Sequence, residues 1–103
     1  TSDTRFAHAS TGAHPGRGLT ALGRRAVATL NRLGIIVDVS HVSDRTVRDV
    51  LDVSARPVMA SHSSARALAD HPRNLPDDLI RAIASRGGAI CLNYYAQFLD
   101  PDY

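Results

Sequence analysis

Two histidines each close an apolar, strand-like run of this sequence. His41 follows residues 35–40 and His62 follows residues 57–61, and one helix-like stretch separates the two runs. In parallel α/β folds the carboxyl ends of neighbouring strands meet on one face, which is where ligands and metals are held. Because neighbouring strands lie about 5 Å apart, two imidazoles at such ends can reach one zinc ion. A histidine satisfied by a backbone or hydroxyl group is the alternative for each position, and spacing alone leaves both interpretations open.

Two histidines do not complete a zinc site, because catalytic zinc normally takes three protein ligands and a water. Asp38 lies deeper in the first run, and Asp70 and His71 read as a helix cap and a loop residue. His8 and His14 belong to an irregular N-terminal stretch, where we expect solvated side chains. The missing ligands are therefore expected outside this chain.

Hydroxyl and guanidinium groups surround the two histidines in the sequence. No Gly-x-Ser-x-Gly element marks a serine nucleophile, so we expect the hydroxyls to orient the imidazoles. Arg73 lies in a proline-flanked loop after His62, where an arginine is usually a solvated charge. Its planar fork nevertheless suits a carboxylate ligand. The hydroxyl residues are Ser40, Ser43, Ser61, Ser63 and Ser64.

Helical and strand-like patterns alternate along the chain and predict the elements that position these residues. Gly34 suits a helix end, Ser43 an N-cap and Pro76 a helix start. The alternation predicts an α/β fold with about three parallel strands and flanking helices, as in a partial (β/α)8 TIM-type barrel. We expect helices over 19–33, 43–53, 64–70 and 76–86, and strands over 35–39, 57–61 and 89–94.

Composition narrows the class of protein. The 103 residues are 44% hydrophobic and carry a net charge of +2, which fits one globular domain and does not demand a nucleic-acid partner. No apolar stretch approaches the roughly 18–20 residues of a membrane span, so we expect no transmembrane segment. Cys91 is the single cysteine and lies in an apolar run, where a buried, inert thiol is expected.

Three short motifs carry a family resemblance. They are Asp-Val-Ser-His at 38–41, Ser-His-Ser-Ser at 61–64 and His-Pro-Arg-Asn at 71–74. In this order they closely resemble the membrane (renal) dipeptidase family of zinc peptidases, over about Gly18 to Tyr95. The resemblance implies a (β/α)8 barrel with two zinc ions, which cleaves dipeptides, including some with a D-residue at the C-terminal position.

The resemblance also implies roles for single residues. His41 and His62 match the two histidines that bind one of the zincs, and Arg73 matches the arginine that grips the free carboxylate of the dipeptide. Phe98 falls where some members place a tyrosine by the substrate. The other metal ligands and the acidic residue that handles the leaving-group proton are expected outside the chain, which leaves no catalytic residue within it.

We therefore predict an irregular segment at 1–17 and the central portion of a dipeptidase barrel at 18–103. The predicted function is zinc-dependent hydrolysis of a dipeptide substrate by a metal-activated hydroxide, and the isolated fragment is expected to be inactive. One alternative is another amidohydrolase-type, metal-dependent barrel hydrolase. The second alternative is an inactive truncated fragment with no catalytic function. A homodimer of the full-length parent and a cytoplasmic location are further expectations.

Overall fold

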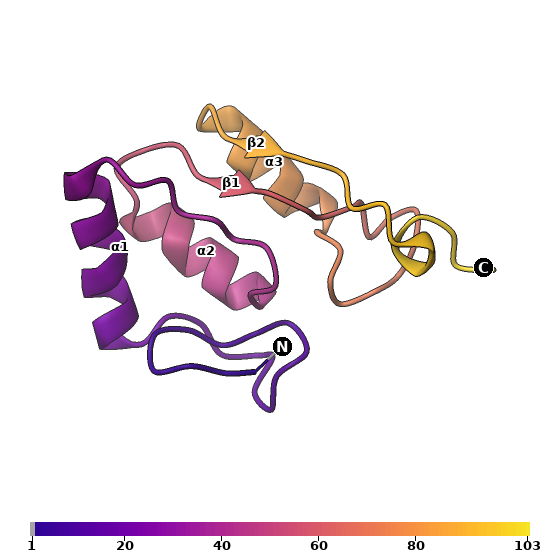
Figure 1. Ribbon diagram of the computed structural model, residues 1–103, viewed down its shortest axis with the longest axis horizontal. Helices are drawn as coiled ribbons and strands as arrows, with labels where there is room; N and C mark the ends of the chain where they lie inside the picture. Colours follow the sequence, from indigo (N-terminus) through magenta and orange to yellow (C-terminus); the bar gives the residue numbers. More distant parts are fainter. Residues whose placement is uncertain (1) are drawn as a thin grey trace.

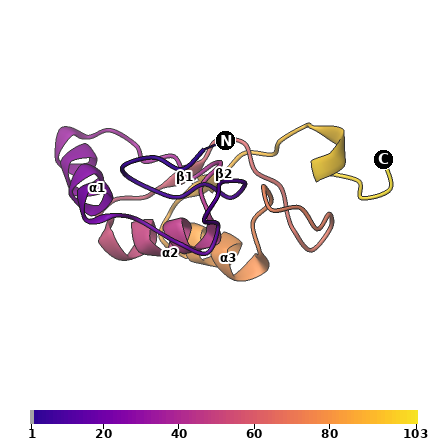
Figure 2. The ribbon, with the colours of Figure 1, turned by 90° about the horizontal axis from the view of Figure 1, so that it is seen from below.

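The computed structural model describes residues 2–103, which contain three α-helices, two short strands and one 3-10 turn. Figure 1 shows α1 at one end and the C-terminal segment at the other, and Figure 2 shows α2 and α3 on one side of the strands. The elements, in chain order, are α1 (Ala21–Leu33), α2 (Asp44–Val53), β1 (Met59–Ala60), α3 (Asp77–Ser85), β2 (Ala89–Ile90) and η1 (Ala96–Phe98).

Capping residues set the ends of the helices, and those at Gly34, Ser43 and Pro76 are the ones that the sequence predicts, whereas the first helix begins at Ala21 rather than near Leu19. The Thr20 side chain accepts from a backbone amide in the first turn of α1, and Gly34 ends that helix in the left-handed conformation, at φ 73°. Ser43 caps α2 in the same way through its hydroxyl. Pro76 precedes α3, which begins with two aspartates that complement the helix dipole. All three long helices are thus confirmed.

The strands are shorter than predicted. β1 and β2 pair in parallel, with Met59 opposite Ala89 and Ala60 opposite Ile90. The expected strand at 35–39 is reduced to an isolated parallel bridge between Asp38 and Met59. The parallel α/β arrangement is confirmed, whereas this two-stranded sheet does not by itself show a barrel.

Two competing interactions explain the short first run. At its start, the Ile35 amide donates to the carbonyl of Leu30 at 2.9 Å and so completes the end of α1. At its end, an Asp38 carboxylate oxygen accepts from the amides of Ser40 and Ser61, which replaces ladder bonds with side-chain bonds. Ile35 remains 50% exposed, so this run is not covered on both faces as a central parallel strand would be.

The apolar core lies between the strands and the helices α2 and α3. Leu79 and Ile83 of α3 and Val47 of α2 are almost completely buried there, together with Val39 and Ala60 from the extended segments. Burial of these side chains fixes the helices against the sheet and therefore fixes the loops that follow each strand.

Two local predictions are wrong. Residues 64–70 form turns rather than a short helix, because the Arg66 amide donates to the Leu75 carbonyl across the loop instead of within a helical turn. Cys91 is exposed, although its amide continues the pairing beyond β2 by donating to Ala60 at 2.8 Å.

The N-terminal segment matches its expected irregular character. Residues 2–17 hold no helix, and their bridge to the rest of the chain is the antiparallel pair Ala9 and Val42. The proposed boundary between 1–17 and 18–103 stays a prediction. Within residues 2–103 no helix has the length and apolar character that crossing a membrane requires.

Candidate metal and substrate site

The structure brings the two strand-end histidines together, as the sequence predicts. The Nε2 atoms of His41 and His62 lie 2.8 Å apart, and the ring centroids are 4.8 Å apart. His62 follows β1 and His41 follows the extended segment that pairs with β1. Neighbouring parallel segments therefore deliver both imidazoles to one point.

The backbone at His41 is held in an uncommon conformation. Its φ of 73° lies in the left-handed region, which costs free energy for any residue other than glycine. The N-terminal segment supports this turn, since the Ser10 amide donates to the His41 carbonyl at 2.9 Å and Ala9 bridges Val42. Left-handed non-glycine residues gather at functional sites, and this one carries a candidate ligand.

A relay of hydrogen bonds fixes the tautomer of His62. The Ser61 hydroxyl donates its single proton to Asp38 Oδ2, because an ionised carboxylate can only accept. The Ser61 oxygen must then accept from His62 Nδ1, which lies 2.7 Å away. The proton of His62 is therefore on Nδ1, its Nε2 keeps a lone pair for a metal, and the Nε2–H of His41 donates to it.

The Asp38 carboxylate is ionised, as this relay requires. Partial burial raises its pKa, but hydrogen bonds from Ser61 and Ser40 lower it by more, so the net pKa lies below the ordinary value. The pKa of His41 is lowered, first by burial and then by the positive charge of Arg73 and by His62. The neutral imidazole that a metal ligand must present is thus favoured at His41.

Arg73 lies against the histidine pair. It is only 7% exposed, and its Nη2 donates to the His62 carbonyl at 3.4 Å, so the expectation of a solvated charge is wrong. The Phe98 ring covers it, with 5.6 Å between the guanidinium carbon and the ring centroid, and Phe98 also packs on His71 at 4.4 Å. Burial lowers the pKa of Arg73, but a guanidinium remains charged in proteins.

The donor set fits one zinc ion in part. In a tetrahedral site with bonds of about 2.0–2.1 Å, two ligand atoms lie about 3.3 Å apart, so the two Nε2 atoms would separate by roughly half an ångström. Within residues 2–103 no third histidine, cysteine or carboxylate ligand atom joins this pair. Asp38 is not part of such a group; its oxygens accept hydrogen bonds from Ser40 and Ser61.

Comparisons with known proteins identify the family of this chain. Residues 1–103 match the membrane dipeptidase family (peptidase family M19). The chain belongs to this family. The match includes the first 17 residues, so it extends further than the motifs alone indicate.

Three similar proteins illustrate the match. An uncharacterised dipeptidase of Schizosaccharomyces pombe is 46% identical over 100 residues, which cover 94% of this chain and 24% of the relative. A metallopeptidase of Rhodobacter sphaeroides, solved with a phosphinate mimic of the dipeptide L-Ala-D-Ala, is 35% identical with a TM-score of 0.89, over 97% of this chain and 30% of that one. An amidohydrolase of Pseudomonas aeruginosa is 41% identical with a TM-score of 0.76, over 80% of this chain and 25% of that one. The chain spans about a quarter of the length of the curated relative, at 24%.

Proposed function

We propose that this chain is the metal-binding and substrate-binding portion of a zinc dipeptidase. The observation that carries the proposal is the pair of Nε2 atoms 2.8 Å apart, with the His62 tautomer fixed for ligation by Ser61 and Asp38. The family implies a metal, and paired imidazoles favour zinc among the available ions. In this proposal His41 and His62 are two ligands of one ion in a two-zinc centre.

The substrate in this proposal is a dipeptide with a free carboxylate. Arg73 is buried beside His62, and a guanidinium fork binds a carboxylate through two parallel hydrogen bonds. A carboxylate bound at this position would place the preceding peptide bond close to the histidine pair, which selects dipeptides over longer chains. The relative solved with an L-Ala-D-Ala mimic supports this substrate class.

The zinc, when bound, would supply an activated water and a Lewis acid for the peptide carbonyl. Residues of this chain set the protonation of the two histidine ligands. Asp38 and Ser61 hold the His62 proton on Nδ1, and ligation through His41 Nε2 would require the proton of that ring to move to its Nδ1, so that the ring stays neutral. Two histidines are fewer than the three protein ligands of catalytic zinc, so the complete site requires further ligands from the full-length gene product, which we propose to be a (β/α)8 barrel.

A second candidate is hydrolysis of another amide by an amidohydrolase-type barrel. The similar protein from Pseudomonas aeruginosa carries that description, and such enzymes also place histidines at strand ends. The buried Arg73 favours the dipeptidase, because it provides a partner for a free carboxylate.

The two candidates separate in one assay on the zinc-loaded full-length gene product. Substrates are a dipeptide, the same dipeptide with an amidated C-terminus, and a cyclic amide. We expect turnover of the free dipeptide, its loss in His41→Ala and His62→Ala, and a raised KM in Arg73→Met. The matched variant Arg56→Met, at an exposed position, should keep the parent KM.

Turnover of the cyclic amide alone would support the amidohydrolase candidate. Equal turnover of free and amidated dipeptides would remove the role of Arg73, since the amide offers no carboxylate. Absence of any hydrolysis by the zinc-loaded protein would contradict both candidates.

A further inference from the structure

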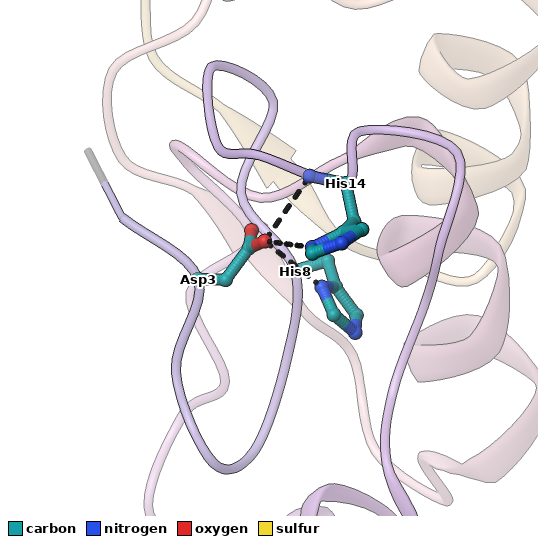
Figure 3. Close-up of side chains that lie close together, drawn as sticks. All are labelled: Asp3, His8 and His14. Atoms are coloured by element: carbon teal, nitrogen blue, oxygen red, sulfur yellow. Dashed lines mark hydrogen bonds and ion pairs between the residues drawn. The ribbon is translucent and has the colours of Figure 1, made fainter.

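A second group of metal-type ligands lies in the N-terminal segment, apart from the histidine pair. Figure 3 shows the side chains of Asp3, His8 and His14 pointing toward one another. Asp3 Oδ2 lies 3.0 Å from His14 Nδ1 and 3.2 Å from His8 Nδ1, and all three ligand atoms lie within 4.8 Å of one another. The sequence predicts solvated histidines at these positions, and the structure instead gathers them around one carboxylate.

We propose that Asp3, His8 and His14 form a separate binding site for a divalent zinc-type cation. Two nitrogen ligands and one carboxylate oxygen are a donor set that zinc takes with a water in the fourth position. Calcium and magnesium prefer oxygen ligands throughout, so this set selects against them. His14 is 54% exposed, which leaves the fourth position open to solvent.

The distances suit a tetrahedral ion. Ligand atoms on zinc with bonds of about 2.0–2.1 Å lie about 3.3 Å apart. Two of the three edges, from Asp3 Oδ2 to His14 Nδ1 and to His8 Nδ1, measure 3.0 and 3.2 Å and need only a small expansion. The third distance, between the two histidine nitrogens, is at most 4.8 Å, and a rotation of the exposed His14 ring would have to shorten it when the ion binds.

The His8 nitrogen provides an independent indication of a missing partner. Its Nδ1 atom is buried and lacks a hydrogen-bond partner, and its contact with Asp3 Oδ2 at 3.2 Å is an ion pair only when the imidazole is protonated. A buried polar nitrogen without a well-made bond costs free energy. A cation between this nitrogen and the carboxylate would satisfy it.

The remaining atoms around the site are already held in place. Asp3 Oδ1 accepts from the Ala9 amide at 3.0 Å and Oδ2 accepts from the His14 amide at 3.1 Å, so two backbone bonds hold the carboxylate with Oδ2 facing the imidazoles. The carbonyl of His8 accepts from the Ser43 amide at 2.9 Å and from the Thr46 hydroxyl at 3.0 Å. The N-terminal segment that carries the three ligands is thus anchored at His8 to the start of α2.

Because the loop is anchored in this way, a bound ion would affect the structure around His41. In the same segment, the Ser10 amide donates a hydrogen bond to the carbonyl of His41, the residue in the left-handed conformation. A cation bound by Asp3, His8 and His14 would therefore cross-link the N-terminal loop and fix its conformation, and this loop supports His41. The cation would stabilise the fold without taking part in the chemistry proposed for the histidine pair.

The test is a zinc titration of the purified 103-residue chain carrying His41→Ala and His62→Ala, with bound metal measured by calorimetry and by elemental analysis. We expect one zinc per chain and an increase in Tm on binding. His8→Gln, His14→Gln and Asp3→Asn should each abolish that zinc. The matched variant is His71→Gln, since this histidine lies in a different loop, against Phe98.

Unchanged zinc content in His8→Gln and His14→Gln would overturn the proposal, and so would equal loss in His71→Gln. If the double-alanine background does not fold, the same glutamine variants in the unmodified chain decide the question. Loss of one zinc equivalent, with retention in His71→Gln, then supports the site, and no loss overturns it. Neither result depends on hydrolytic activity, so the dipeptidase proposal is tested separately.

Discussion

The change Asp38→Asn tests the proton relay behind the candidate metal site. Asparagine keeps the oxygen that accepts from the amides of Ser40 and Ser61, so the local backbone is preserved. It replaces the other oxygen by an NH2 group that donates to the Ser61 hydroxyl. Ser61 then donates to His62 Nδ1, and the imidazole proton moves to Nε2, the atom proposed to bind zinc.

The expected loss of zinc affinity follows from the role of Asp38 and Ser61 in orienting His62. Loss of a group that orients a metal-binding histidine lowers metal affinity by about 10–100-fold, which corresponds to about 1.4–2.7 kcal/mol. Long-range 1H–15N spectra of histidine-labelled chain report the tautomer directly, and zinc titration followed at the His62 signals gives a site-specific affinity. We expect an Nδ1–H tautomer in the parent and an Nε2–H tautomer in Asp38→Asn.

Two comparisons make this prediction refutable. Asp52→Asn makes the same charge change at an exposed position of α2 and should leave tautomer and affinity unchanged. Because Asp38 acts through Ser61, the double variant with Ser61→Ala should bind zinc no more weakly than Ser61→Ala alone. Additive losses, or an unchanged His62 tautomer in Asp38→Asn, would refute the relay.

Two further predictions concern stability. Gly23→Ala should lower the free energy of unfolding by about 1–3 kcal/mol, because the new Cβ would collide with the Phe6 carbonyl. Helix propensity alone predicts the opposite, a gain of about 1 kcal/mol. The control in chemical denaturation is Gly16→Ala, which has open space around it, and a stabilised Gly23→Ala would contradict the close approach to Phe6. The hydrogen bond from Arg48 lowers the pKa of Asp78, so its stabilisation is present above the ordinary carboxyl pKa and is lost as pH falls through the lower folded pKa. The difference in unfolding free energy between the parent and Asp78→Asn should therefore shrink between about pH 6 and pH 2, and a constant difference would contradict this assignment.

The sequence predicts what local signals determine. The helix ends predicted at Gly34 and Ser43 depend on residues within one turn, and both appear in the structure. The convergence of His41 and His62 also follows from local order, because each residue closes a run that pairs in parallel.

Contacts between distant residues could not be predicted in this way. The shortened first strand results from bonds that Asp38 makes to a serine in another loop, and the burial of Arg73 depends on Phe98, which lies far along the chain. The group of Asp3, His8 and His14 forms in a segment without periodicity, where only the fold sets which side chains meet. The residue types were the available signal, since an aspartate and two histidines in one short segment are a zinc-type donor set.

The most direct test of the central claim is a crystal structure of the zinc-loaded full-length gene product, with anomalous scattering at the zinc edge. The proposal predicts a zinc peak about 2.0–2.1 Å from the Nε2 atoms of both His41 and His62. Zinc peaks elsewhere, with the two imidazoles still hydrogen-bonded to each other at 2.8 Å, would contradict it.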